Sequence, residues 1–267
     1  MLEIQSLSVA YHDKLAVNDF TTSIQKGEIV SIVGESGSGK TTLLKAILGL
    51  LPKETSQITG TIMYKNHPLL QLSSKALNEV RGKEIAIVFQ DAGLSLNPIR
   101  KIGTQFIQYI RTHQNMSKQE AHALAIQMLE KVNLKNGDQI MNSYVFNLSG
   151  GMKQRVGLAM AMSLEPSLLL LDEATSALDA TTQMQVVNEI MSLKKEVKSS
   201  ILMITHDIAL ALYMSDKIVV MKKGQVIEVN SAEEILKNPQ HDYTKQLLEN
   251  TPKFEVADKD VRTNPRN

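Results

Sequence analysis

The chain contains no cysteine, which excludes disulfide bonds and thiolate metal sites and fits a reducing cytoplasm. It also contains no apolar run of the roughly 18 residues that a membrane-spanning helix requires. Residues 1–4 show no basic segment followed by an apolar one, so no secretory leader is predicted. We therefore expect a soluble protein, which would act at a membrane only by docking on a partner that supplies the spans.

An excess of charge of one sign is also missing. The 29 basic residues nearly balance the 28 acidic ones, and the formal net charge is +1. With no long single-sign run before the polar tail, nothing indicates a surface that wraps nucleic acid. A length of 267 residues predicts one large α/β domain with an inserted subdomain, or two small domains.

A glycine-rich stretch ending in a lysine follows the apolar run 29–33 and precedes the helix-compatible segment 42–48. Glycines let backbone N–H groups turn inward, and the helix directs its positive end at the same point. The complete G-x-x-x-x-G-K-[ST] pattern between a strand and a helix favours a polyphosphate cradle over an ordinary turn. Lys40 is then predicted to reach the β- and γ-phosphates, and the Thr41 hydroxyl to bind Mg²⁺. The predicted nucleotide-binding residues here are Gly34, Glu35, Ser36, Gly37, Ser38, Gly39, Lys40, Thr41 and Thr42.

Two carboxylates follow the apolar strand predicted over 168–171. Asp172 is placed to hold Mg²⁺ through its water shell, and Glu173 to polarise a water for attack on a γ-phosphate. Solvated turn residues are the alternative, which the upstream cradle disfavours. His206 follows another apolar strand, 200–205, at the same predicted sheet edge, which favours contact with the γ-phosphate.

Polar or aromatic side chains at two other places are weaker candidates. Gln90 and Asp91 follow the predicted strand 85–89, at the end where open α/β sheets keep their ligand-facing groups, but a plain polar strand end is the alternative. Tyr11 precedes the cradle, where a ring can stack on a base. Chemistry alone favours a structural role for this tyrosine.

A second glycine pair occurs in the segment 148–155, which reads LSGGMKQR. Ser149 is a good helix N-cap. Glycine in the first turn weakens a helix, however, and the free N–H groups at Gly150 and Gly151 would make a second anion site. Physics alone leaves the cap and the anion site equally supported.

Periodicity and turn signals outline the remaining elements. The segment 95–164 is predicted to be a helical insertion with a capping box at Ser117–Glu120. Met128, Met152, Met160 and Met162 within it are predicted to act as core filler. The other predicted elements are an antiparallel edge over 2–10 and 20–24, a strand over 60–64, helices over 72–81 and 181–195, a hairpin of 217–221 and 225–229, helices over 231–237 and 241–249, and a flexible tail over 251–267.

Taken in order, these motifs resemble those of an ATP-binding-cassette (ABC) ATPase over about residues 2–250. The resemblance implies a P-loop NTPase (RecA-like) α/β core with an antiparallel β edge and an inserted α-helical subdomain, all within one nucleotide-binding domain, 1–250. It makes Tyr11, with Val17 beside it, an adenine-stacking residue and brings Asp179 to the nucleotide. The family motifs correspond to Walker A at 34–41, the Q-loop at Gln90, the signature at 148–154, Walker B at Asp172 with the catalytic Glu173, the D-loop at 176–179 and the switch His206.

The resemblance also implies the catalytic set Glu173, His206 and Gln90, with ATP and Mg²⁺ as cofactors and Thr41, Gln90 and Asp172 as the metal-binding residues. Ser149, Gly150 and Gly151 of one subunit would close over the ATP of a second, head-to-tail subunit, which is either an identical chain or a paralogue.

Two segments narrow the resemblance to importers of peptides and nickel. FQD followed by SLNP at 89–98, and NPQHDYTK at 238–245, are similar to FQDP-x-x-SLNP and NP-x-HPYT of that branch. The chain departs from the branch where Ala92 and Asp242 replace prolines, and from the wider family where Ala174 follows the catalytic glutamate; Met152 in the fifth signature position is common in this branch.

This branch implies a motor that couples ATP hydrolysis to uptake of oligopeptides, dipeptides, nickel or a metal chelate. Its partners would be two permease subunits and, indirectly, an extracytoplasmic substrate-binding protein, with no nucleic acid. The motor would lie at the cytoplasmic face of the cell membrane.

The motifs are also compatible with two other functions. An ABC-type ATPase acting on nucleic acid or ribosomes typically carries tandem cassettes, long coiled arms or zinc modules, and this sequence shows none of them. A non-catalytic nucleotide-binding regulator is disfavoured by the intact Glu173 and His206.

Overall fold

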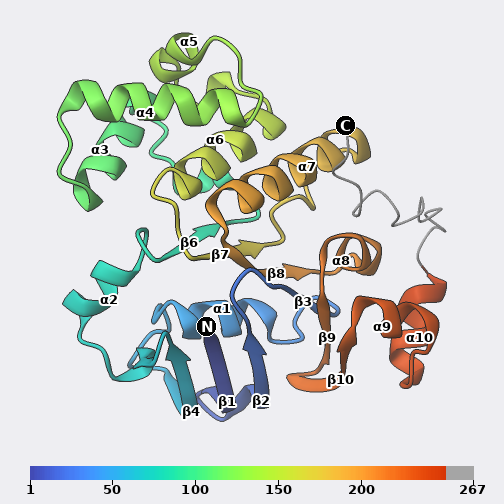
Figure 1. The fold of residues 1–267 in the computed structure, drawn as a ribbon. Coiled ribbons are helices and arrows are strands. Elements are labelled where there is room, and N and C mark those ends of the chain that lie inside the picture. The colour runs from blue at the N-terminus through green and yellow to red at the C-terminus, as the bar shows by residue number, and fades with distance from the viewer. Residues whose placement is uncertain (251–267) are drawn as a thin grey trace.

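The computed structural model describes residues 1–250, so the predicted tail over 251–267 lies outside the described residues. A six-stranded sheet, a four-stranded sheet and several groups of helices make up the fold (Figure 1). Within the described part of the chain, no helix is both long enough and apolar enough to cross a bilayer.

The central sheet has the strand order β10-β9-β3-β8-β7-β6. All neighbouring pairs are parallel except β9 and β10, which form an antiparallel hairpin at one edge. Every residue of β3 and β8 is buried because both faces of the sheet are covered. The strands are β3 (Ile29–Val33), β6 (Ile85–Val88), β7 (Leu168–Asp172), β8 (Ser200–Thr205), β9 (Lys217–Lys222) and β10 (Gln225–Ser231).

Alternate residues of these strands enter two different cores, as the period of two along a strand requires. Ile32 and Leu170 pack in a cluster with α1 (Lys40–Ile47) and the four-stranded sheet. Val33 and Leu171 pack in the other cluster, with the helices on the opposite face. The sheet is therefore the middle layer of the fold, with one hydrophobic core on each of its two faces.

The four-stranded sheet has the order β2-β1-β4-β5 and is antiparallel throughout. The strand predicted over 20–24 begins earlier, because Tyr11 pairs with Lys14 across a tight turn in which His12 has a φ of 50°. That turn contains no glycine, so the usual hairpin signal is absent from the sequence. The strands are β1 (Leu2–Tyr11), β2 (Lys14–Ile24), β4 (Ser56–Tyr64) and β5 (His67–Pro68).

The chain between β6 and β7 is helical, and its helices gather at the end of the molecule away from β1, β2 and β4 (Figure 1). Ser117 and Glu120 form the predicted capping box. Met128 and Met162 are buried and Met152 and Met160 pack against the same cluster, which confirms their role as core filler. The helices here are α3 (Ile102–His113), α4 (Lys118–Lys131), α5 (Gly137–Asn142) and α6 (Gly150–Met162), with short 3₁₀ turns at Ala92–Ser95 and Val145–Asn147.

A nearly buried ion pair joins α6 to α7 (Ala180–Val197). Arg155 donates from Nε to both carboxylate oxygens of Glu189, at 3.1 and 3.0 Å, and from a terminal nitrogen to Gln185 at 2.9 Å. Asn133 at the end of α4 also donates to Glu189, at 3.0 Å. Because the pair is hydrogen-bonded on several sides, it ties the three helices together.

The remaining helices surround these layers. The predicted helices over 231–237 and 241–249 are confirmed as α9 and α10, with bounds that differ by one residue at their starts. The set consists of α2 (Ser74–Val80), α8 (Ile208–Met214), α9 (Ala232–Lys237), α10 (Asp242–Glu249) and a 3₁₀ turn at Leu69–Gln71.

Candidate nucleotide site

The glycine-rich loop leads from β3 into α1, and its glycines are required where other main chains approach it. A Cβ on Gly34 would lie 2.1 Å from the carbonyl oxygen of Met221, and one on Gly39 would lie 2.4 Å from that of Ala16. Gly39 also has a φ of 100°, a conformation that side chains disfavour. Strands β2 and β9 therefore pack directly on the loop, which they could not do with larger residues at these positions.

Lys40 is buried inside this loop, with 4% of its surface exposed. Its Nζ donates to the carbonyl oxygens of Gly34 and Glu35, both at 2.7 Å, and to Ser38 Oγ at 3.4 Å. Burial lowers the pKa of Lys40, while the carboxylates of Glu173 and Asp172 oppose that shift. The ammonium group is thus held by loop carbonyls at the sheet edge where the acidic residues lie.

The first turn of α1 leaves backbone donors free. Gly39 is the N-cap and provides no side-chain hydrogen bond, and the first backbone bond of the helix runs from Leu43 N to the Gly39 carbonyl at 3.1 Å. The N–H groups of Lys40, Thr41 and Thr42 accordingly have no partner among the described residues. Free N–H groups at a helix start, next to an ammonium, form an environment suited to phosphate oxygens.

Thr41 and Asp172 meet across the loop. Thr41 Oγ1 donates to Asp172 Oδ1 at 3.4 Å, and burial together with the charge of Glu173 raises the pKa of Asp172. A hydroxyl and a carboxylate are the oxygen ligands that Mg²⁺ takes when substrate phosphates and water complete its shell. The two side chains therefore fit a magnesium ion, and a cation there would relieve the unfavourable burial of the Asp172 charge.

Glu173 and His206, which follow adjacent strands, are in contact. His206 Nδ1 lies 3.1 Å from Glu173 Oε2. Glu173 has a φ of 48°, and its N–H still bonds to the Ile204 carbonyl of β8 at 2.9 Å. This left-handed backbone lets the chain leave β7 while keeping the ladder to β8, and such strain is typical of functional positions.

Gln90 is connected to Glu173 through the side chain of Ser176. Gln90 Nε2 donates to Ser176 Oγ at 3.2 Å, and Ser176 Oγ donates to the Glu173 carbonyl oxygen at 3.0 Å. The structure therefore brings together Gln90, Glu173 and His206, the three residues predicted to be catalytic. The serine that links them is the first residue of the predicted D-loop.

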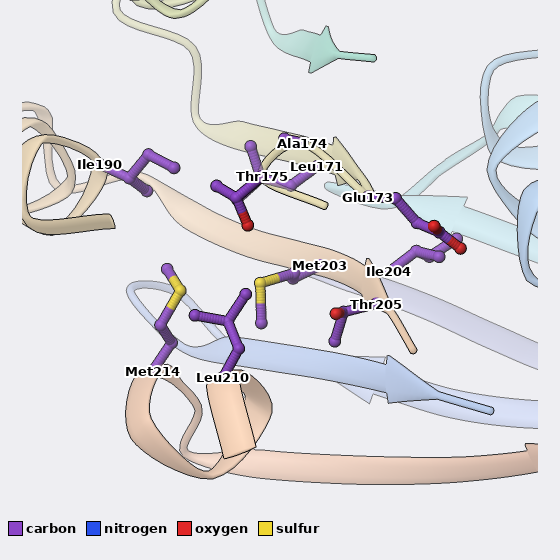
Figure 2. Close-up of a pocket in the computed structure, with 10 residues that line it drawn as sticks. All are labelled: Leu171, Glu173, Ala174, Thr175, Ile190, Met203, Ile204, Thr205, Leu210 and Met214. Carbon is purple, nitrogen blue, oxygen red and sulfur yellow. The ribbon is translucent and has the colours of Figure 1, made fainter. Parts of the chain in front are cut away.

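A small cavity lies beneath Glu173 (Figure 2). Its volume of about 10 Å³ is near the minimum for one water molecule, and its lining is mostly apolar. Figure 2 shows the Glu173 carboxylate on the side away from Leu210 and Met214. The cavity is a packing gap behind the site, and the carboxylate faces away from it.

Gln154 is a site residue that the sequence motifs did not single out. It is 4% exposed, donates from Nε2 to the Phe89 carbonyl at 3.0 Å and accepts from Ala92 N at 3.4 Å. These two bonds bracket Gln90 on either side. Gly157, one turn along α6, permits this approach, since a Cβ there would lie 2.6 Å from that of Ala92. In the sequence, Gln154 was only the last residue of the predicted signature, 148–154, and no role was predicted for it.

The second glycine pair lies apart from the cradle. Ser149 caps α6 by accepting a hydrogen bond from Met152 N at 3.3 Å, which confirms the cap. A Cβ on Gly151 would lie 2.7 Å from a methyl group of Thr182 in α7. Among residues 1–250, no hydrogen bond joins 149–151 to the loop 34–41.

Two further predicted nucleotide contacts also lie outside this cluster. Asp179 is the N-cap of α7, with its carboxylate on Thr182 N at 3.0 Å and Thr182 Oγ1 at 2.7 Å. These hydrogen bonds lower the pKa of Asp179. Tyr11 ends β1, opposite Lys14 and Ser56.

Comparison with known proteins identifies the class. The family model described as ABC transporter matches residues 17–176. The dimeric, post-hydrolysis structure of the ATP-binding cassette MJ0796 bound to ADP and Pi has a TM-score of 0.77 at 27% identity, covering 87% of this chain and 99% of that one. CbiO1 from Clostridium perfringens, part of the complex cbiONQ, has a TM-score of 0.76 at 27% identity, covering 89% and 90%. The chain belongs to the ABC transporter family and is an ATP-binding ABC ATPase.

Its branch follows from the curated relatives. The oligopeptide transport ATP-binding protein OppD of Lactococcus lactis subsp. cremoris is 35% identical over 269 aligned residues, covering 99% of this chain and 80% of the relative. The dipeptide transport ATP-binding protein DppD of Haemophilus influenzae is 37% identical, covering 95% and 78%. The metal-staphylopine import system ATP-binding protein CntD of Staphylococcus aureus is 36% identical, covering 95% and 94%. The predicted family, branch, fold class and ATPase activity are confirmed.

We expect Gln154→Met to release the Q-loop from α6, because methionine keeps the volume but leaves the Phe89 carbonyl and Ala92 N–H without partners. Amide exchange at Ala92 should accelerate at least about tenfold, with a loss of roughly 1–3 kcal/mol in unfolding free energy. Gln183→Met is the matched control, since among the described residues the Gln183 side chain donates a hydrogen bond only to Thr175 Oγ1, at 3.3 Å. Unchanged amide exchange at Ala92 in Gln154→Met would show that the Gln154 side chain does not hold the Q-loop.

Proposed function

We propose that this chain is the motor subunit of an importer that takes up oligopeptides, dipeptides, nickel or a metal chelate through a membrane permease. The relatives named for oligopeptide, dipeptide and metal-staphylopine transport support the cargo class. The observation that carries the motor role is the meeting of Lys40, Asp172, Glu173 and His206 at one edge of the sheet.

Lys40 is proposed to exchange its loop carbonyls for the β- and γ-phosphates of ATP. The three free N–H groups at the start of α1 would receive further phosphate oxygens, and Tyr11 would stack on the adenine. Thr41, Asp172 and Gln90 would hold Mg²⁺, which when bound neutralises charge on the phosphates. The short contacts already made by Lys40 are of the kind that oxygen atoms of a phosphate would replace.

Glu173 is proposed to orient and deprotonate the attacking water, and His206 to contact the γ-phosphate. Their present contact at 3.1 Å would open when the phosphate arrives between them and the cradle. Gln90 shares a serine with Glu173, so movement of the Q-loop would be felt at the catalytic carboxylate.

A second subunit would complete the site. Ser149, Gly150 and Gly151 carry free N–H groups at the start of α6, and nothing within the described chain bonds them to the cradle. Head-to-tail pairing would place them over the γ-phosphate of the partner's ATP. The dimeric state of the MJ0796 cassette supports the proposal that two subunits pair. Cleavage of ATP would remove the phosphate that joins the subunits.

The permease is proposed to dock beside the Q-loop. Leu94 and Ile99 are 84% and 82% exposed there, more than any other large apolar side chain of the described residues. Next to them α3, α4 and α5 border an open groove of about 570 Å³ whose lining includes Arg100, Arg111 and Lys118. No acidic residue of the described chain lines it, so it suits an amphipathic permease segment with acidic side chains. Docking there would place the chain at the cytoplasmic face of the membrane.

Lys40→Ala should weaken MgATP binding by at least about tenfold, because a charge-assisted contact to phosphate is lost. Isothermal titration calorimetry with the purified chain measures this. Lys53→Ala, which removes an exposed lysine in the segment after α1, is the control and should bind as the wild type does. Equal affinity of the wild type and Lys40→Ala would refute the cradle.

Glu173→Gln should retain MgATP binding but lose at least about a hundredfold in turnover, because the general base is gone. Trapped ATP should also make the variant dimeric in light scattering. Glu165→Gln, an exposed change just before β7, serves as the control. Near-normal turnover of Glu173→Gln would remove this residue from its proposed role.

The transport assignment is tested with tagged Glu173→Gln chain isolated from membranes in the presence of ATP. It should retain two membrane-spanning subunits, and the wild-type complex in proteoliposomes should accumulate a labelled tripeptide or a nickel chelate when its substrate-binding protein is added. Recovery of the chain with RNA or ribosomes in place of a permease would support the nucleic-acid reading instead.

A further inference from the structure

The phosphate loop is held from outside by a residue near the end of the described chain. Tyr243, on α10, accepts a hydrogen bond at its hydroxyl from the N–H of Glu35 at 3.2 Å. The ring is 3% exposed, and the ammonium of Lys222 in β9 lies 4.2 Å from its centroid. The two partners of this hydrogen bond are 208 residues apart in the sequence.

The segment that carries Tyr243 is itself anchored. The Glu228 carboxylate of β10 accepts hydrogen bonds from Gln240 N at 2.9 Å and His241 N at 3.0 Å. His241 then caps α10, with Nδ1 accepting from Tyr243 N at 3.0 Å. Because each link is a hydrogen bond to a fixed strand or a helix start, the position of the hydroxyl is determined by the β9–β10 hairpin.

The bond to Glu35 acts on Lys40 through a single peptide group. The Glu35 N–H and the Gly34 carbonyl belong to the same planar unit, and in a trans peptide they point in opposite directions. Tyr243 holds the N–H on one side, while Lys40 Nζ donates to the carbonyl on the other at 2.7 Å. The orientation of this peptide therefore sets where the lysine rests.

We propose that Tyr243 is a positioning residue for nucleotide binding, which holds the Gly34–Glu35 peptide so that the loop and Lys40 are pre-arranged for the phosphates. This inference rests on the proposed function of the loop. Burial raises the pKa of Tyr243, so its hydroxyl stays neutral at physiological pH. Within residues 1–250 no hydrogen bond joins Tyr243 to Glu173 or His206, so Tyr243 should affect nucleotide binding and leave the chemical step unchanged.

Tyr243→Phe tests the proposal, since it removes the hydroxyl and keeps the ring, its burial and its contact with Lys222. We expect the KM for MgATP to rise about fivefold, the loss of one neutral hydrogen bond, with kcat within about twofold of the wild type. An unchanged or lowered KM, or a fall in kcat at constant KM, would overturn the proposal.

Tyr109→Phe is the matched control. Tyr109 on α3 is partly buried and donates its hydroxyl to the Gly82 carbonyl at 3.3 Å, far along the chain from the loop. The change should lower stability as Tyr243→Phe does but leave KM unaltered. An equal rise in KM in both variants would show that the effect is one of general stability and would refute the positioning role.

Amide exchange at Glu35 gives a readout that does not require nucleotide. The Glu35 N–H should be protected in the wild type and in Tyr109→Phe, and should exchange at least about tenfold faster in Tyr243→Phe. If the wild type failed to bind MgATP, the proposed function would fall while this exchange experiment still decided whether Tyr243 holds the loop. Equal exchange in all three proteins would refute the contact itself.

Discussion

A buried ammonium group on two backbone carbonyls is the interaction on which the rest of this structure depends. Burial of Lys40 costs solvation, and it is tolerated because Gly34 and Glu35 accept its hydrogen bonds while two carboxylates lie nearby. Asp172 shows the complementary effect, a carboxylate whose pKa is raised by its own burial. The two opposite charges are thus held at one sheet edge in an arrangement that a magnesium–phosphate group would stabilise further.

Parallel pairing explains why these groups meet. Val33 pairs with Thr205, and Asp172 pairs with Ile204, so β3, β7 and β8 end at the same edge. The residues that follow each strand are therefore neighbours although they lie far apart in the sequence. The same edge receives Gln90, because β6 pairs with β7. Each strand contributes one functional group, and the sheet sets their spacing.

The helical layer contributes differently. Arg155 and Gln154, adjacent residues of α6, connect this helix to α7 through Glu189 and to the Q-loop through Phe89 and Ala92. Hydrogen bonds therefore join the segment that would contact a partner's ATP to the segment that would sense the permease. The phosphate loop, in contrast, is held by β2, the β9–β10 hairpin and Tyr243. A two-part motor follows from this division, with one part binding phosphates and the other carrying the proposed contacts to partners.

Local patterns in the sequence determined most of the secondary structure and most of the residues of the candidate site. The complete glycine-lysine pattern, the apolar strands ending in Asp172 and His206 and the capping box at Ser117 each depend on neighbouring residues only, so they were readable in advance. The start of β2 was predicted wrongly because its turn contains no glycine. Gln154 and Tyr243 lie inside the signature 148–154 and the segment 238–245 that the resemblance named, but their hydrogen bonds could not be predicted because the partners, Phe89 and Glu35, are distant in the chain. Sequence patterns specify which groups exist, but only the packing of sheets and helices decides which backbone atoms those groups hold, since hydrogen bonds over long separations depend on tertiary geometry.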